Sequence, residues 1–268
     1  MTHLVGEAHG NLMHGTKGPR MTRTEYHRLD APSLGGSAEV AVHGHWGRPV
    51  IWFPSEGGAP WDFEANGMLD AVRPAVDDGR ITVFCVPSFD QSSWSASWMP
   101  LTDRARNHRR YEDWIIWQVV PFIRDKCGGR DDIALAGPSM GAFHAVLFAL
   151  RHPHVFARAV GMSGSYDPWT WRAWGPADDE TYFANPMQFL PGTHGGHLDY
   201  LRSRLAITLV VGSGMWEDTT GANDSTRALA GVLSEKQIPH ELFVWGNEWP
   251  HDWPSWRAQA AIYLPALG

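Results

Sequence analysis

Residues 137–141, Gly-Pro-Ser-Met-Gly, place Ser139 between two glycines with one residue on either side. An apolar run comes directly before this segment, and a second apolar run with His144 as its one polar residue follows. A Gly-x-Ser-x-Gly segment between a strand and a helix forms a turn so tight that a Cβ at either glycine would clash. Such a turn holds the hydroxyl at a helix N-terminus, where the helix dipole favours developing negative charge. The pattern predicts that Ser139 is a nucleophile and not an ordinary turn serine.

A serine nucleophile needs a base, and the base needs an acid that orients it. In chains built around this turn the order is serine, acid, histidine, and each follows a strand. His251 follows the last predicted strand, so we predict that it is the base. Glu217 and Asp218 both follow the strand before it; Glu217 is nearer and is the favoured acid, with Asp218 as the alternative. Asp252 is predicted to cap the final helix instead.

A tetrahedral intermediate also needs two backbone N–H groups aimed at its negatively charged oxygen. Met140, directly after the serine, is the expected first donor. The second donor is expected from the segment 53–58, "FPSEGG", whose glycines allow close backbone approach. Gly57 is the favoured residue there and Glu56 the alternative. A simple glycine turn is the competing interpretation of this segment.

These residues must be positioned by regular elements that alternate along the chain. Alternating patterns predict two antiparallel strands at 24–31 and 38–46, and apolar runs predict further strands at 49–53, 81–86, 132–137, 156–164, 205–212 and 240–245. Helical patterns cover 64–77, 103–126, a segment from residue 140, 222–236 and 253–264. We expect Pro74 to interrupt the first helix and Pro121 to kink the second. The alternation predicts an α/β-hydrolase fold, with a mostly parallel sheet covered by helices on both faces.

The chain of 268 residues is predicted to form one domain over 21–268, preceded by a flexible tail over 1–20. Residues 165–204 are rich in Trp, Pro and Gly, and we expect an irregular insert there. Long connections of this kind often carry function, so the insert is the expected seat of specificity. The chain holds 15 Trp, many of them in loops, which favours an apolar or aromatic substrate group; Trp216 is a candidate contact.

Composition excludes several function classes. A net charge of -7 without a basic run argues against a nucleic-acid surface. No window approaches 18 apolar residues, so no membrane span is expected. The N-terminus lacks a signal-peptide pattern, and Cys85 and Cys127 lie beside apolar runs as reduced, structural thiols, so we expect a cytoplasmic protein.

Metal and cofactor motifs are weak. His43 with His45, and His194 with His197, have no carboxylate or thiolate at a recognisable metal-ligand spacing. Neither of the glycine-rich nucleotide-binding patterns occurs. We therefore expect neither a metal ion nor an organic cofactor.

Several quoted segments, taken together, resemble one family over about residues 35–266. These are "FPSEGG", "VPSFDQSSW", "YEDWIIWQVVPFI", "GPSMGAFHAVLFALRHPHVF", "MSGSYD" and "HDWPSW". The chain is similar to the esterase family of α/β hydrolases that includes esterase D-type S-formylglutathione hydrolases, enterochelin esterases and mycolyltransferases. The resemblance implies a triad on Ser139, His251 and either Glu217 or Asp218.

The segment "VPSFDQSSW" is similar to a loop that borders the acyl site of the mycolyltransferases. The resemblance therefore implies that Asp90, Ser93 and Trp94 form part of the substrate wall. The expected function is hydrolysis of a small carboxylic ester through an acyl-enzyme. An acyltransferase with an alcohol acceptor and a non-catalytic binding protein on the same scaffold are the alternatives.

Overall fold

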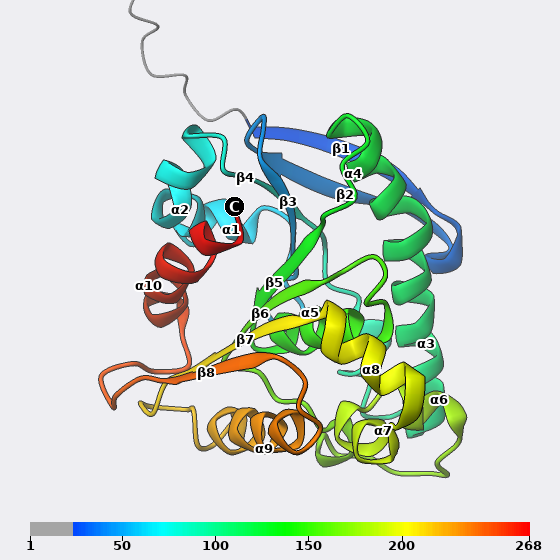
Figure 1. The fold of residues 1–268 in the computed structure, drawn as a ribbon. Helices are drawn as coiled ribbons and strands as arrows, with labels where there is room; N and C mark the ends of the chain where they lie inside the picture. Colours follow the sequence, from blue (N-terminus) through cyan, green and yellow to red (C-terminus); the bar gives the residue numbers. More distant parts are fainter. Residues whose placement is uncertain (1–23) are drawn as a thin grey trace, which may run out of the picture.

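The computed structural model describes residues 24–268, which fold around an eight-stranded sheet in the order β1-β2-β4-β3-β5-β6-β7-β8 (Figure 1). The six strands β4, β3, β5, β6, β7 and β8 are parallel to one another. At one edge β2 pairs antiparallel with β4, and β1 pairs antiparallel with β2. The strands are β1 Thr24–Ala31, β2 Gly36–His43, β3 Arg48–Trp52, β4 Ile81–Cys85, β5 Ala134–Pro138, β6 Arg158–Met162, β7 Ala206–Val211 and β8 His240–Val244. The predicted fold class is confirmed.

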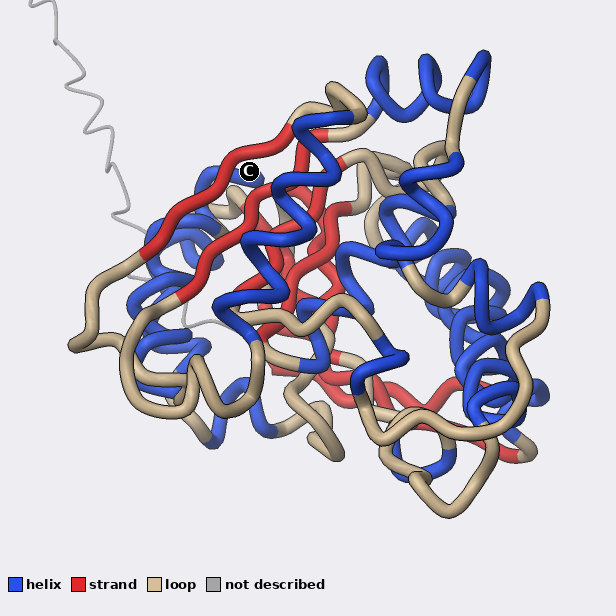
Figure 2. Tube along the Cα trace, turned by 90° about the horizontal axis from the view of Figure 1, so that it is seen from below, coloured by secondary structure: helices blue, strands red, loops and turns tan. Residues whose placement is uncertain are grey.

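Helices cover both faces of this sheet (Figure 2). The helices are α1 Asp62–Ala65, α2 Met68–Asp77, α3 Leu101–Trp114, α4 Val120–Lys126, α5 Met140–Arg151, α6 Asp179–Phe183, α7 Pro186–Gly192, α8 Gly195–Arg204, α9 Ala222–Glu235 and α10 Trp253–Tyr263. Side chains of α1, α2 and α10 pack in one core, and those of α3, α4, α5 and α9 in the other. Successive residues along a strand point to opposite faces, so Trp52 joins the first core and Ile51 the second.

The predicted helix over 103–126 is divided by a π-helical segment, Ile115–Val119, between α3 and α4. Pro121 has no N–H to donate to the preceding turn, so the regular pattern of α-helical hydrogen bonds is interrupted there. Pro74 has less effect than predicted, since α2 runs through it. The interruption falls earlier, at Gly67, whose φ of 72° ends α1 and begins α2.

The insert at 165–204 is less irregular than predicted, because it contains α6, α7 and α8. Asp178 caps α6 in a capping box with Thr181, and Asn185 caps α7. The three helices are short, and their Pro and Gly content conceals the helical periodicity. The predicted flexible tail, 1–20, lies outside the described residues. None of the helices within 24–268 is long and apolar enough to cross a membrane.

A buried histidine on β2 should make the fold sensitive to acid. His43 is fully buried against Phe63, and burial, with the nearby charge of Arg73, lowers the pKa of His43 from 6.5 to about 4. Between about pH 6.5 and pH 4 the unfolded chain binds a proton at His43 and the folded chain does not. The free energy of unfolding therefore falls as the pH drops through this range. Between pH 7 and pH 4.5 the His43 contribution is about 2 kcal/mol.

We predict that His43→Phe weakens this pH dependence, as measured by urea unfolding at pH 7 and pH 4.5. His45→Phe is the matched control, because His45 is an exposed neighbour on the same segment. The His108 side chain, whose pKa burial also lowers, contributes equally in both variants. An unchanged loss of stability in His43→Phe would contradict the prediction.

Candidate active site

Ser139 occupies the sharp turn between β5 and α5, with φ 54° and ψ -121°. A Cβ added at Gly137 would lie 2.5 Å from the carbonyl oxygen of Phe53, and one at Gly141 would lie 2.2 Å from the same oxygen. Both distances are far below contact, so the predicted need for glycine at each position is confirmed. Residues 141–150 of α5 are all buried, which fixes the helix behind the serine.

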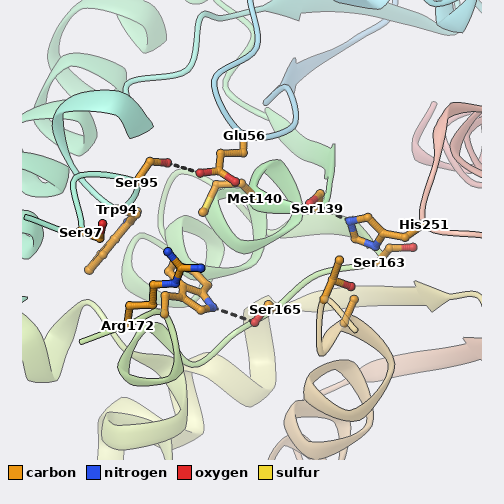
Figure 3. A pocket seen from close by; sticks show the side chains of 13 residues that line it. Glu56, Trp94, Ser95, Ser97, Ser139, Met140, Ser163, Ser165, Arg172 and His251 are labelled. Atoms are coloured by element: carbon orange, nitrogen blue, oxygen red, sulfur yellow. Dashed lines mark hydrogen bonds between the residues drawn. The ribbon is translucent and has the colours of Figure 1, made fainter. Parts of the chain in front are cut away.

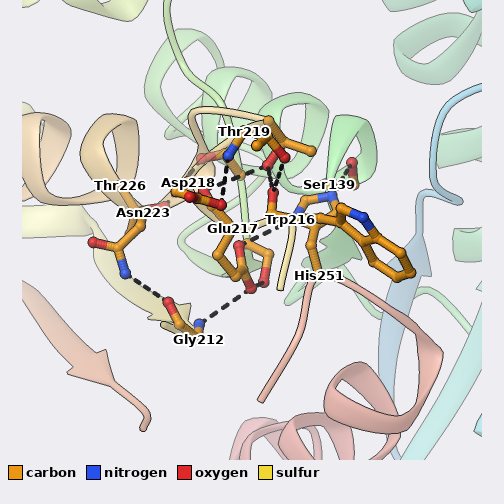
Figure 4. A network of polar contacts seen from close by, with 12 residues as sticks. Ser139, Gly212, Trp216, Glu217, Asp218, Thr219, Asn223, Thr226 and His251 are labelled. Carbon is orange, nitrogen blue, oxygen red and sulfur yellow. Dashed lines mark hydrogen bonds and ion pairs between the residues drawn. The ribbon is translucent and has the colours of Figure 1, made fainter. Parts of the chain in front are cut away.

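Three of the predicted site residues form one hydrogen-bonded chain (Figure 4). The Nε2 atom of His251 lies 2.9 Å from Ser139 Oγ, and its Nδ1 atom lies 3.1 Å from Glu217 Oε2. A carboxylate can only accept, so Nδ1 carries the proton and the lone pair of Nε2 faces the serine hydroxyl. This arrangement suits removal of a proton from Ser139.

Glu217 is fully buried and is held by two further donors. Ser163 Oγ donates to Glu217 Oε1 at 2.5 Å, and the Gly212 N–H donates to the same oxygen at 3.2 Å. Asp218 is not part of this hydrogen-bonded set of residues. Its carboxylate accepts from the N–H of Thr219 at 2.8 Å. Sequence reasoning gave no role to Ser163, although its place directly after β6 puts it at the same edge of the sheet as the other site residues.

His251 is oriented by its own loop and by α10. Its N–H donates to the carbonyl of Met215 at 2.9 Å, and its ring meets Trp256 edge-on with centroids 5.2 Å apart. Asp252 caps α10 by accepting from the N–H of Trp253 at 2.7 Å, which confirms the prediction for that residue. The imidazole itself is contacted by Ser139, Glu217 and Trp256.

A cavity of about 460 Å³ opens beside the hydrogen-bonded residues Ser139 and His251, which line it together with Trp94 and other residues (Figure 3). Of the four expected substrate-wall residues, Trp94 is the one in this lining. Trp216 has an exposed side chain with φ 70° and is outside the cavity. Ser93 is buried and donates to the carbonyl of Phe89.

Asp90 is buried and is not part of the cavity lining. Its carboxylate is 1% exposed, accepts from Ser88 Oγ at 2.5 Å and lies 3.0 Å from His144 Nε2. His144 in turn contacts His108 through ring nitrogens 3.1 Å apart. The second Asp90 oxygen also accepts from the N–H of Gly57 at 3.4 Å, so this buried network supports the segment 53–58 from below.

A family model described as "Putative esterase" matches residues 46–265. The chain belongs to this esterase family. The esterase is 22% identical to the diacylglycerol acyltransferase/mycolyltransferase Ag85A of Mycobacterium tuberculosis, over 98% of this chain and 86% of the relative.

Solved structures share the fold at low identity. A ferulic acid esterase superposes with a TM-score of 0.72 at 15% identity, covering 92% of this chain and 98% of its own. An S-formylglutathione hydrolase from Staphylococcus aureus superposes with a TM-score of 0.66 at 16% identity, covering 93% and 98%. The chain is a member of an α/β-hydrolase family of carboxylic ester hydrolases, as its sequence predicts.

The two candidate residues for the second oxyanion donor are oriented differently in the esterase. The N–H of Gly57 points to Asp90, whereas Glu56 lines the cavity. Within residues 24–268 no acceptor is found for the N–H of Glu56. Met140, the other expected donor, lines the cavity at the N-terminus of α5. The geometry therefore favours Glu56 over Gly57.

Both cysteines are unpaired. Burial raises the pKa of the Cys85 thiol well above its ordinary value, so that thiol is protonated and unreactive. In the part of the chain that the structure describes, no group of three or more His, Cys, Asp or Glu could hold a metal ion.

Proposed function

We propose that the esterase cleaves carboxylic esters through an acyl-enzyme, with Ser139 as nucleophile, His251 as base and acid, and Glu217 as the residue that orients His251. The observation that carries this proposal is the hydrogen-bonded chain from Ser139 through His251 to Glu217 at a cavity large enough for a small substrate.

The first half of the reaction forms the acyl-enzyme. Ser139 Oγ attacks the ester carbonyl carbon while His251 Nε2 takes its proton. The resulting tetrahedral intermediate carries its negative charge on the former carbonyl oxygen. When the intermediate collapses, the bond to the alcohol oxygen breaks and His251 returns the proton to the leaving alcohol.

The second half releases the acid. Water replaces the alcohol, His251 removes its proton, and the hydroxide oxygen attacks the acyl carbon. Collapse of the second intermediate frees the carboxylic acid and returns the proton to Ser139. Glu217, which accepts from His251 Nδ1, stabilises the imidazolium that forms in both halves.

The N–H groups of Met140 and Glu56 are the proposed oxyanion donors. Each would stabilise the transition state by about 3 kcal/mol. The donors already point at the site before the reaction, so little free energy is spent on reorienting them. The Asp90 network would hold the segment 53–58 so that Glu56 stays in place.

An acyltransferase is the second candidate, favoured by the similarity to Ag85A. It shares the acyl-enzyme and differs only in which acceptor attacks it. We expect purified protein to hydrolyse p-nitrophenyl butyrate, with free butyrate as the main product measured by mass spectrometry. Added glycerol, as a small alcohol acceptor, should change the product distribution little. A product consisting mainly of the new ester would favour the transferase, and no turnover of any ester would contradict both candidates.

A further inference from the structure

The cavity lining of the esterase contains a single cationic side chain among its described residues, Arg172 (Figure 3). This residue follows the short 3₁₀ turn Pro168–Thr170 in the insert. Arg172 is exposed, and no described residue accepts a hydrogen bond or ion pair from its guanidinium. A guanidinium presents five donors and no acceptor, so Arg172 brings unused donors to the site.

The backbone that carries Arg172 is held in place by a buried residue. Arg104 on α3 is fully buried and donates to the carbonyl of Trp171 at 2.8 Å and to that of Arg172 at 3.3 Å. Burial lowers the pKa of Arg104, a cost that its two backbone contacts offset in part. Arg172 itself has φ 50°, a left-handed conformation that a residue with a side chain adopts only where its surroundings impose it.

Trp171 fixes the same segment from the side of the cavity. Its indole N–H donates to Ser165 Oγ at 2.9 Å, and its ring packs edge-on against Phe143 and Trp94 with centroids 4.9 and 5.8 Å away. Trp94, Trp171 and Arg172 therefore form one wall of the cavity, with aromatic surface beside a cation. This wall could receive a substrate that is apolar in part and negatively charged at one point.

Glu56 is the acidic member of the same lining. Glu56 accepts a hydrogen bond from Ser95 Oγ, and Glu56 forms no ion pair with Arg172 in the described structure. The chain as a whole is negative at -7, so its overall field repels anions. Attraction of an anion to this cavity would therefore have to be local and would depend on Arg172, whose planar fork matches a carboxylate or phosphate.

We propose that the substrate of this esterase carries an anionic group, a carboxylate, phosphate or sulfate, and that Arg172 determines this specificity. The inference rests on the proposed function. The anionic group belongs either to the acyl half or to the alcohol half of the ester, and the experiment separates the two.

The test compares matched charged and neutral esters. For the acyl half the pair is mono-p-nitrophenyl glutarate and p-nitrophenyl valerate; for the alcohol half it is 4-acetoxybenzoate and its methyl ester. The measured quantity is the ratio of kcat/KM for the charged ester to that for the neutral one. Because intrinsic reactivity is the same for every variant, the change in this ratio between wild type and variant isolates the contribution of Arg172.

We expect Arg172→Gln to lower this ratio about tenfold in one of the two pairs, in line with the strength of hydrogen bonds to charged groups. Turnover of the neutral esters should stay within about threefold, and Arg172→Lys should retain part of the preference. Arg73→Gln on α2 removes the same charge from a residue outside the cavity lining, so it should leave the ratio unchanged. The effect of Arg172 should weaken in high salt.

An unchanged ratio in both pairs, with neutral esters still turned over, would overturn the inference and leave the proposed function standing. Absence of turnover of all four esters by the wild type would instead overturn the proposed function, and this inference with it.

Discussion

Ser139→Ala should lower kcat for ester hydrolysis by about 10⁴-fold or more, because the acyl-enzyme cannot form without the serine oxygen. The measurement is the rate of p-nitrophenolate release from p-nitrophenyl butyrate at saturating substrate. Residual activity should stay above the uncatalysed rate, since the proposed oxyanion donors and the cavity remain. The KM should change little, because the hydroxyl contributes mainly after the substrate has bound.

The same change should leave the fold intact. Alanine has a Cβ like serine, so the strain of φ 54° is unchanged, and the turn is defined by the close approach of Gly137 and Gly141 to Phe53. We expect the free energy of unfolding to change by less than about 1 kcal/mol. Ser203→Ala on α8 is the control, since Ser203 bonds only to a neighbouring carbonyl on an exposed helix. A Ser139→Ala protein that kept a tenth of the wild-type kcat would contradict the proposed mechanism.

Glu217→Gln should lower kcat by about 10³-fold to 10⁴-fold. The amide has the size of the carboxylate but no charge, so it no longer stabilises the imidazolium. It also offers an N–H₂ group to surroundings that already donate, namely Ser163, Gly212 and His251. One of these donors must lose its acceptor or rotate, and the proton of His251 moves to the wrong nitrogen.

Asp218→Asn is the matched control for this variant. Asp218 directly follows Glu217 and carries the same charge, but it accepts only from the N–H of Thr219 in its own loop. Its kcat should stay within about threefold of the wild type. A larger loss in Asp218→Asn than in Glu217→Gln would assign the orienting role to Asp218 and would contradict the geometry.

Local sequence patterns carry most of the fold and the main site residues. Buried strands and helices have distinct periods, and an elbow serine between them leaves a signature that spans only five residues. The proposed acid and base then follow from chain order, since the carboxyl ends of parallel strands lie at one edge of the sheet. The shorter distance from the strand favours Glu217 over Asp218, and the Glu217 carboxylate is the one that lies 3.1 Å from His251 Nδ1.

What the sequence could not reveal depends on contacts between distant segments. Asp90 looked like a wall residue, yet its carboxylate is turned inward by His144, which is 54 residues away. Ser163 supports Glu217 across another 54 residues, and nothing near Ser163 in the sequence indicates this contact. The choice of Glu56 over Gly57 follows from where Asp90 lies, so it could not be made before Asp90 was placed.

The most direct test of Ser139 as an activated nucleophile is to identify the residue that a fluorophosphonate modifies. Wild-type protein would be incubated with the reagent, and its intact mass would be measured by mass spectrometry. The protein would then be digested to locate the adduct, with His251→Ala treated in parallel. We predict one adduct per chain on Ser139 in the wild type and labelling at least about 10³-fold slower in His251→Ala. A folded wild-type protein that stays unmodified, or that is modified on another residue, would contradict the assignment of Ser139 as an activated nucleophile.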